Sequence, residues 1–141
     1  MSELVVLNQN SDFKRLYNRG TSYTNPALVM YLMKNRAGIC RIGITSSKKI
    51  GNAVQRNTSR RKVRAAFAPI YKEHADDLQG YDIIFVCRVK TRFKKSTEIE
   101  KIIRSQFIEA GIIKSWFYEK RSYFIYQILS KTHFAKAPTY V

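Results

Sequence analysis

AVQRNTSRRKVRAAFAPIY, residues 53–71, is the stretch of sequence that decides the fold. Its apolar residues recur at intervals of three and four, which predicts an amphipathic helix. At 100° per residue the apolar side chains fall within an arc of about 100°, and the neighbouring arc is basic. The apolar arc holds Val63, Ala66, Phe67 and Ile70, and the basic arc holds Asn57, Arg60, Arg61 and Arg64. Because the apolar arc has to face a sheet, we expect the basic arc at the edge of a rigid support.

The segment before this helix is polar, and its spacing predicts a loop over residues 46–52 that brings Lys48 and Lys49 to the start of the helix. Arg56 precedes Val63 by more than a turn, so we expect it to project past the core toward this loop. Unpaired N–H groups and a partial positive charge at a helix N-terminus favour phosphate oxygens. Guanidinium groups on a rigid element also bind phosphate. We therefore expect this helix to bind phosphate, with a merely solvated basic face as the alternative.

The residues before residue 46 predict one short helix and a pair of strands. The helix has Ser11 as its N-cap and ends at Gly20. The apolar run 27–33 is typical of a strand covered on both faces, and residues 35–38 predict a hairpin turn into a second strand at 39–45.

The residues after the basic helix predict a further strand and a further helix. Residues 81–89 alternate as a strand, and Thr97 with Glu100 forms a capping box for a helix that ends before Gly111. The resulting order is helix, two or three strands, helix, strand, helix. This order predicts a small α+β sandwich, with one sheet and helices packed on it.

Charge points to a polyanionic partner. The 141 residues include 26 Lys and Arg against 10 Asp and Glu, a formal charge of +16, and 45% of the residues are hydrophobic, enough for a core. Residues 13–72 contain no acid at all, so the folded chain repels itself unless an anion compensates. RNA or DNA is the expected partner, and a solvated basic surface or anionic lipid is the alternative. No apolar run reaches membrane-spanning length and no secretory signal is visible, so we expect a cytoplasmic protein.

Residues typical of a hydrolytic or metal site are missing from the pattern. Asp76 and Asp77 precede a turn at Gly80 and are expected in a solvated loop, while His74 and His133 are far apart and expected on the surface. No phosphate-binding glycine loop or zinc-protease motif occurs. Two cysteines lie within apolar runs and are expected to be buried free thiols: Cys40 and Cys87.

Aromatic residues provide a second signal of nucleic-acid binding. Phe13 and Tyr17 share one face of the first helix, and Tyr31 interrupts an aliphatic strand, where its hydroxyl needs a partner or water. If the three line an open groove, they can stack against single-stranded bases. Burial of Phe13 in the core is the alternative.

Taken together, these segments resemble the protein subunit of bacterial ribonuclease P. The resemblance rests on residues 47–57 continuing through 60–67, which match the family's Arg-Asn-Arg helix and its preceding loop. Residues 12–22, the strand with Tyr31 and residues 81–84 support it, and coverage runs from about residue 7 to residue 114. Thr58 stands where the family usually has arginine.

The resemblance implies a fold and a function. The fold is an α+β two-layer α/β sandwich in the order αβββαβα, ribosomal protein S5 domain 2-like, with a left-handed βαβ crossover. Residues 1–114 form the ribonuclease P protein-like RNA-binding domain, and residues 115–141 are an extension of unknown role. The function is to bind ribonuclease P RNA and the 5′ leader of precursor tRNA, and so to promote hydrolysis of the one phosphodiester bond that frees the mature 5′ end.

The resemblance also implies the site residues. Positions implied to bind the RNA subunit or phosphate are Lys48, Lys49, Asn52, Arg56, Asn57, Arg60, Arg61, Lys62 and Arg64. Positions implied to bind the leader are Phe13, Tyr17 and Tyr31. No residue of the protein is catalytic or binds a metal, because magnesium and the chemistry belong to the RNA in the ribonucleoprotein. No membrane is involved, and weak self-association stays open. The alternatives are a ribosomal or other structured-RNA protein and a nuclease that works without RNA.

Overall fold

A five-stranded mixed sheet organises the chain, and the computed structural model describes residues 4–114 of it. The strands are β1 (Leu4–Val6), β2 (Thr21–Asn25), β3 (Leu28–Lys34), β4 (Cys40–Ser46) and β5 (Tyr81–Cys87), in the order β1-β4-β5-β3-β2. The helices are α1 (Asn10–Arg19), α2 (Ala53–Leu78) and α3 (Ser96–Glu109), with 3₁₀ turns η1 (Lys48–Ile50) and η2 (Val89–Phe93). The predicted α+β class is confirmed.

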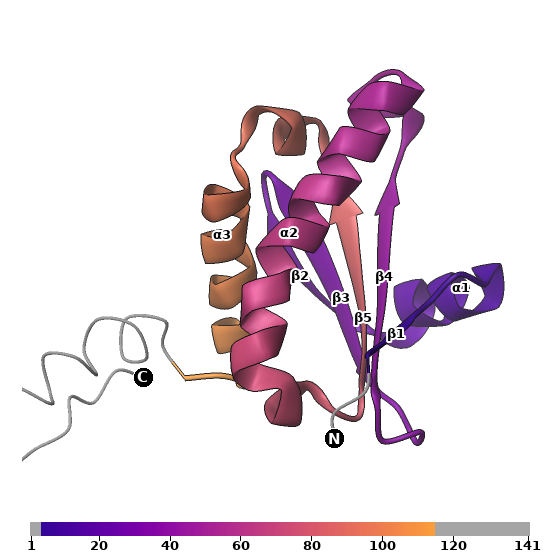
Figure 1. Ribbon diagram of the computed structural model, residues 1–141. Coiled ribbons are helices and arrows are strands. Elements are labelled where there is room, and N and C mark those ends of the chain that lie inside the picture. The colour runs from indigo at the N-terminus through magenta and orange to yellow at the C-terminus, as the bar shows by residue number, and fades with distance from the viewer. Residues whose placement is uncertain (1–3, 115–141) are drawn as a thin grey trace, which may run out of the picture.

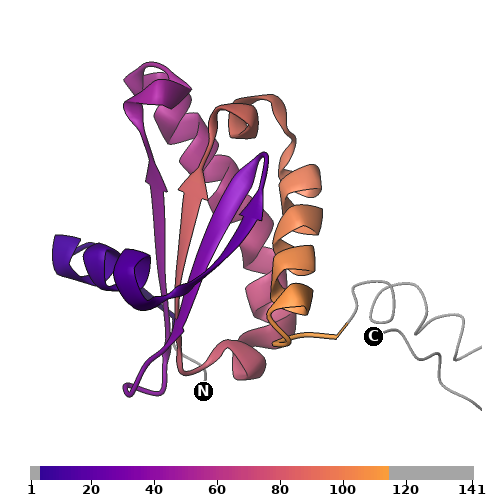
Figure 2. The same ribbon diagram turned by 180° about the vertical axis from the view of Figure 1, so that it is seen from behind.

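Helices cover the two faces of the sheet unequally. Helices α2 and α3 lie side by side on one face, and α1 lies on the other (Figures 1 and 2). Alternation along β5 explains this, because Ile83 and Phe85 pack under α2 and α3 whereas Ile84 packs under Leu16 of α1. The α1 side therefore keeps part of its sheet face open.

The connection between β4 and β5 has the unusual hand. These strands run parallel, and α2 joins them. In Figure 1 the chain rises along β4, descends through α2 on the near side and enters β5 to the left, which is a left-handed crossover. As a result β5 lies between β3 and β4 and pairs with both. The predicted hairpin at 35–38 is therefore wrong: the turn is present, but β5 separates the strands it joins.

The apolar arc of α2 is buried as predicted. Val63 and Ile70 are 0% exposed, Ala66 is 1% and Phe67 is 3%. Phe67 also meets two other rings of the core, with ring centroids 5.6 Å from Phe85 and 6.3 Å from Phe107. The helix is thus fixed against the sheet along one line of side chains.

Helix α2 continues beyond Tyr71, because Ile70, His74 and Leu78 extend the buried line at intervals of four. Two expectations are wrong for this reason. His74 is buried rather than on the surface, and it lies at a kink with φ −124°. Asp76 and Asp77 belong to the last turns of the helix rather than to a loop.

Several helix and strand ends depart from the predicted signals. Strand β5 ends at Cys87, whereas the predicted strand continued to residue 89, because Val89 begins η2. Helix α1 begins at Asn10 rather than after Ser11, and α3 begins at Ser96 rather than after Thr97. Glu100 does not cap α3, because its carboxylate accepts from Arg104 Nε at 2.9 Å. Strand β1, three residues long, was not predicted at all.

Some expectations fall outside the described residues or are simply confirmed. Gly111 follows α3 with φ +77° as expected. His133 and the extension 115–141 lie outside residues 4–114. Within that described range, no helix is both long enough and apolar enough to span a bilayer.

One buried carboxylate ties α1 to the sheet. Asp82 is 0% exposed and accepts hydrogen bonds from Arg15 Nη2 at 2.6 Å, from Arg41 Nε at 2.6 Å and Nη2 at 2.9 Å, and from Asn35 Nδ2 at 2.8 Å. These bonds raise the pKa of Arg41. Asp82 thus joins α1, β4 and the β3–β4 turn through a single side chain.

Removing this carboxylate should destabilise the fold. Because Asp82→Ala leaves two partly buried guanidiniums without their anion, we expect a loss of about 3 kcal/mol in the free energy of unfolding, measured by urea denaturation. Glu109→Ala removes an exposed acid at the end of α3 and is the control. A loss from Asp82→Ala no larger than the loss from the control would contradict the role assigned to Asp82.

Both cysteines are buried free thiols, as predicted. Burial raises the pKa of Cys40 to about 12 and that of Cys87 to about 11. The native state therefore favours the protonated form of both thiols. This preference stabilises the fold fully below the pKa of an unfolded thiol, and the stabilisation is lost as the pH rises from there through the raised pKa values. At about pH 8 a thiol reagent should leave the native protein unmodified and label both residues in denaturant. Rapid labelling of native protein would show that the thiols are not buried.

Candidate nucleic-acid interface

The N-terminal end of α2 is a rigid corner. Asn52 Oδ1 accepts from Gln55 N at 2.9 Å and Gln55 Oε1 accepts from Asn52 N at 2.9 Å, a reciprocal capping box. Gly51 precedes it with φ +146°, and a Cβ there would lie 1.9 Å from Gln55 Oε1. Only glycine fits this corner without strain. The carboxamide oxygen of Asn52, one of the predicted phosphate contacts, is therefore engaged in capping.

Arg56 and the preceding loop meet as the helix geometry predicts. Arg56 Nη1 donates to the Gly51 carbonyl at 2.7 Å, so its guanidinium points back toward the loop. Lys48 and Lys49 lie in η1 with exposed side chains, at the same end of α2. One corner of the molecule thus gathers three cations from two elements.

The basic arc lies beside the buried arc of α2. Asn57, Arg61 and Arg64 are exposed, and Arg60 is half-buried where its guanidinium donates to Ser46 at the end of β4 and to Asn57. Anchoring one arginine to the sheet limits the freedom of the arc, so less conformational entropy is lost when a phosphate binds.

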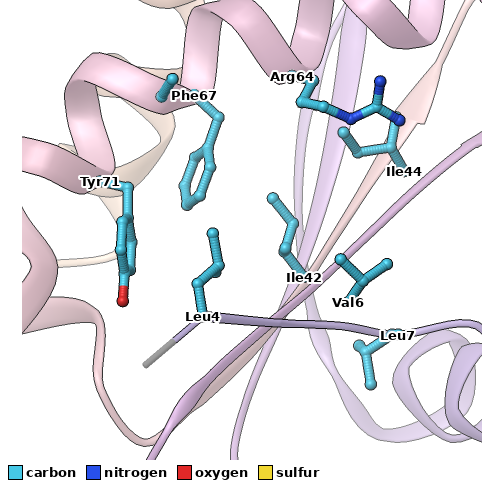
Figure 3. Close-up of a pocket in the computed structure, with 9 residues that line it drawn as sticks. Leu4, Val6, Leu7, Ile42, Ile44, Arg64, Phe67 and Tyr71 are labelled. Carbon is cyan, nitrogen blue, oxygen red and sulfur yellow. The ribbon is translucent and has the colours of Figure 1, made fainter. Parts of the chain in front are cut away.

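Arg64 lies at the rim of an apolar groove between α2 and the β1–β4 edge (Figure 3). The groove has a volume of about 340 Å³, and Leu4, Ile42 and Phe67 are among its lining residues. Figure 3 shows the guanidinium of Arg64 beside Ile44, on the side of the groove away from Phe67 and Tyr71. The charge of Arg64 therefore stays available to a ligand while its stem covers apolar surface.

Lys62 does not join the basic arc. Its Nζ donates to the Arg92 carbonyl at 2.7 Å, and it lines a shallow cleft with Thr58 and Arg92 on the η2 side of α2. Arg92 in turn donates from Nη1 to the Ile50 carbonyl at 2.9 Å.

The basic residues of η2 were not among the site residues predicted from the sequence. Arg88, Lys90 and Arg92 lie on or beside η2, next to the start of α2. Phe93, 72% exposed, follows directly, with Arg92 Cζ 5.1 Å from its ring centroid. The sequence signal was the run 88–95, in which basic residues occupy every second position up to Lys94. Only the fold shows that this run adjoins the corner of α2.

The three predicted aromatics do come together, on the opposite face of the sheet. Phe13 and Tyr17 have ring centroids 6.4 Å apart, and Tyr17 meets Tyr31 edge-on at 4.9 Å. Phe13 packs over Gly43, whose missing Cβ would lie 2.9 Å from the Phe13 ring. We call Phe13, Tyr17 and Tyr31 the aromatic cluster.

Tyr17 is the open member of this cluster, with 41% of its surface exposed. Partial burial and the neighbouring Tyr31 raise the pKa of Tyr17, while a hydrogen bond with Thr45 lowers it. The phenol therefore stays protonated and neutral near pH 7, able to stack or donate to a nucleic acid without repelling phosphate.

The two surfaces differ in the chemistry that they offer to a ligand. Within residues 4–114 no three His, Cys, Asp or Glu side chains gather in a group that could hold a metal ion. The α2 corner and arc offer cations to a polyanion, and the aromatic cluster offers ring faces and edges to bases.

Comparison with known proteins identifies the family. The family model described as Ribonuclease P matches residues 1–111. A "Ribonuclease P protein component" of Clostridium botulinum (strain Loch Maree / Type A3) is 36% identical over 106 residues, 75% of this chain and 94% of the relative. One of Clostridioides difficile (strain 630) is 38% identical over 101 residues, 70% of this chain and 85% of the relative.

Solved structures agree. The RNase P protein of Staphylococcus aureus has a TM-score of 0.66 at 31% identity, covering 78% of this chain and 98% of that one. That of Thermotoga maritima, solved with 1-(4-fluorophenyl)-2-thiourea, has a TM-score of 0.60 at 28% identity, covering 71% and 95%. A match to the family model over most of the chain, and relatives covered along most of their length, show that this chain belongs to the ribonuclease P protein family.

Proposed function

We propose that this chain is the protein component of a ribonuclease P, where it binds the catalytic RNA and the 5′ leader of precursor tRNA. The basic arc beside the buried arc of α2 carries the proposal. In this account the RNA subunit cuts the phosphodiester bond, magnesium is held in the ribonucleoprotein, and the protein supplies affinity and screens phosphate repulsion.

The RNA subunit is proposed to bind α2. Arg61 and Arg64 are exposed, Arg60 is anchored at Ser46, and Lys48 and Lys49 extend the same surface. Fixed guanidiniums favour phosphates held at set positions, as in a folded RNA, over a mobile chain. Residues 13–72 supply no acid to oppose them.

The leader is proposed to bind the aromatic cluster. A leader is single-stranded, so its bases are free to stack, whereas duplex bases are not. Tyr17 is exposed enough to receive a base, and Tyr31 supports it from the sheet. Because the cluster and α2 lie on opposite faces, the two RNAs need not compete for one surface.

Reconstitution tests the proposal. Purified protein alone should leave precursor tRNA intact, and protein with a bacterial ribonuclease P RNA at low magnesium should release the leader at the mature 5′ end. Cutting by the protein alone would instead support a nuclease that works without RNA. Tight RNA binding that gives no stimulation of cleavage would support a structured-RNA protein of another kind.

The two surfaces should separate by mutation. Arg61→Ala should weaken binding to ribonuclease P RNA, and Tyr17→Ala should weaken leader binding by about 10-fold, since one base–aromatic stack contributes about 1 to 3 kcal/mol. Fluorescence anisotropy with labelled RNA subunit, and with precursor tRNA on the assembled holoenzyme, measures both. Lys72→Ala removes an exposed cation of α2 that lies two turns beyond Arg64, and serves as the control. Equal effects of the two variants in both assays would contradict separate surfaces.

A further inference from the structure

A second basic site lies on the α1 side of the sheet, at the end of the sheet where β4 and β5 begin. It is a pocket of about 500 Å³. Five cations from α1, β3, the β3–β4 turn and β4 line it: Arg15, Arg19, Lys34, Arg36 and Arg41. None of these residues belongs to the α2 surface or to the aromatic cluster. We call this the basic pocket.

Two of its arginines are built into the fold. Asp82 holds Arg15 at 2.6 Å and Arg41 at 2.6 and 2.9 Å, so both guanidiniums are fixed at the floor. They remain 33% and 26% exposed, which leaves N–H groups open to the pocket. A buried carboxylate thus positions donors that a ligand can reach.

The cations exceed the acids around them. Five cations less Asp82 give +4 among the lining residues, and Asp12, which pairs with Arg15 at 3.3 Å, reduces this to +3. Arg19, Lys34 and Arg36 have exposed side chains. Converging like charges repel one another unless an anion joins them, so the pocket favours an anionic ligand.

Register places the pocket directly beside the aromatic cluster. On β3, Tyr31 of the cluster pairs with Ile84, and Met33 of the pocket pairs with Asp82. These positions are two residues apart on the same face, about 7 Å along the strand. A strand of RNA with a base at Tyr17 and Tyr31 that continues toward Met33 brings its backbone to the pocket.

We propose that the basic pocket binds a backbone phosphate of the single-stranded leader, and so fixes the number of leader nucleotides that the protein reads. The inference rests on the proposed leader binding and adds a phosphate contact at one end of the aromatic cluster. Stacking alone is insensitive to leader length beyond the stacked bases. A phosphate site at one end of the cluster makes affinity rise until the leader reaches it.

The test compares leader lengths on the reconstituted holoenzyme. Precursor tRNAs with a leader of about two and of about ten nucleotides are bound to holoenzyme containing wild-type protein or the double variant Arg19→Ala/Arg36→Ala. Both residues are exposed and neither pairs with Asp82, so the fold should be kept, which a melting curve checks. The wild type should bind the long leader more tightly than the short one. In the double variant the ratio of these two affinities should fall by about 10-fold, because an electrostatic contact is removed.

A matched variant controls for net charge. Lys72→Ala/Lys101→Ala also removes two exposed cations, but from α2 and α3 on the other face, and should keep the full preference for the long leader. Equal loss in both double variants would overturn the pocket and leave only general attraction. An unchanged preference in Arg19→Ala/Arg36→Ala would overturn it as well. A wild-type holoenzyme with no preference at all would instead refute the proposed leader binding on which the pocket depends.

Competition with inorganic phosphate tests whether the pocket binds a phosphate of the leader or a free phosphate ion. Added at constant ionic strength, it should not reduce the wild-type preference for the long leader more than chloride does, because one free ion lacks the neighbouring stacked base. A selective loss in phosphate, absent in the double variant, would show that the pocket prefers a free anion and would overturn its assignment to the leader.

Discussion

Burial of one arc of α2 is the constraint on which the rest of the structure depends. Val63, Phe67 and Ile70 are almost wholly removed from water, and full burial of such a side chain contributes about 2 kcal/mol. The helix cannot rotate about its axis without exposing them. The basic arc is therefore held beside the sheet, and the capping box at Asn52 fixes where it starts. The position of the cations thus follows from apolar packing rather than from any contact among the cations themselves.

The left-handed crossover and the buried Asp82 divide the molecule into two working faces. Because α2 returns on one face only, the other keeps β3, β4 and β5 partly open beneath α1. Asp82 then sets the position of α1 through Arg15, and α1 carries two of the three aromatic rings. One face is suited to a folded polyanion and the other to an extended strand. The proposed simultaneous binding of two RNAs requires such a division.

Local pattern predicts the α2 arcs, the shared face of Phe13 and Tyr17, and the strands at 27–33 and 81–89, whose bounds lie within two residues of those of β3 and β5. Each of these features depends on spacing along a single element. What the sequence could not show depends on contacts between distant elements. The turn at 35–38 is a turn, yet nothing within it reveals that β5 enters between its strands. Asp82 is an acid in an apolar strand, and its two arginine partners are 67 and 41 residues away. Lys62 lies beside the arginines in sequence but faces η2, since a single residue turns the helix by 100°.

The salt dependence of binding to ribonuclease P RNA tests the central claim most directly. Each phosphate contact contributes about 0.7 to 0.9 to the slope of log affinity against log salt. The wild type should show a steep slope, and removal of Arg60, Arg61 and Arg64 together by alanine should lower it by about 2 while the melting temperature stays near that of the wild type. An unchanged slope in a folded triple variant would contradict the account, because the arc of α2 would then not be what grips the RNA.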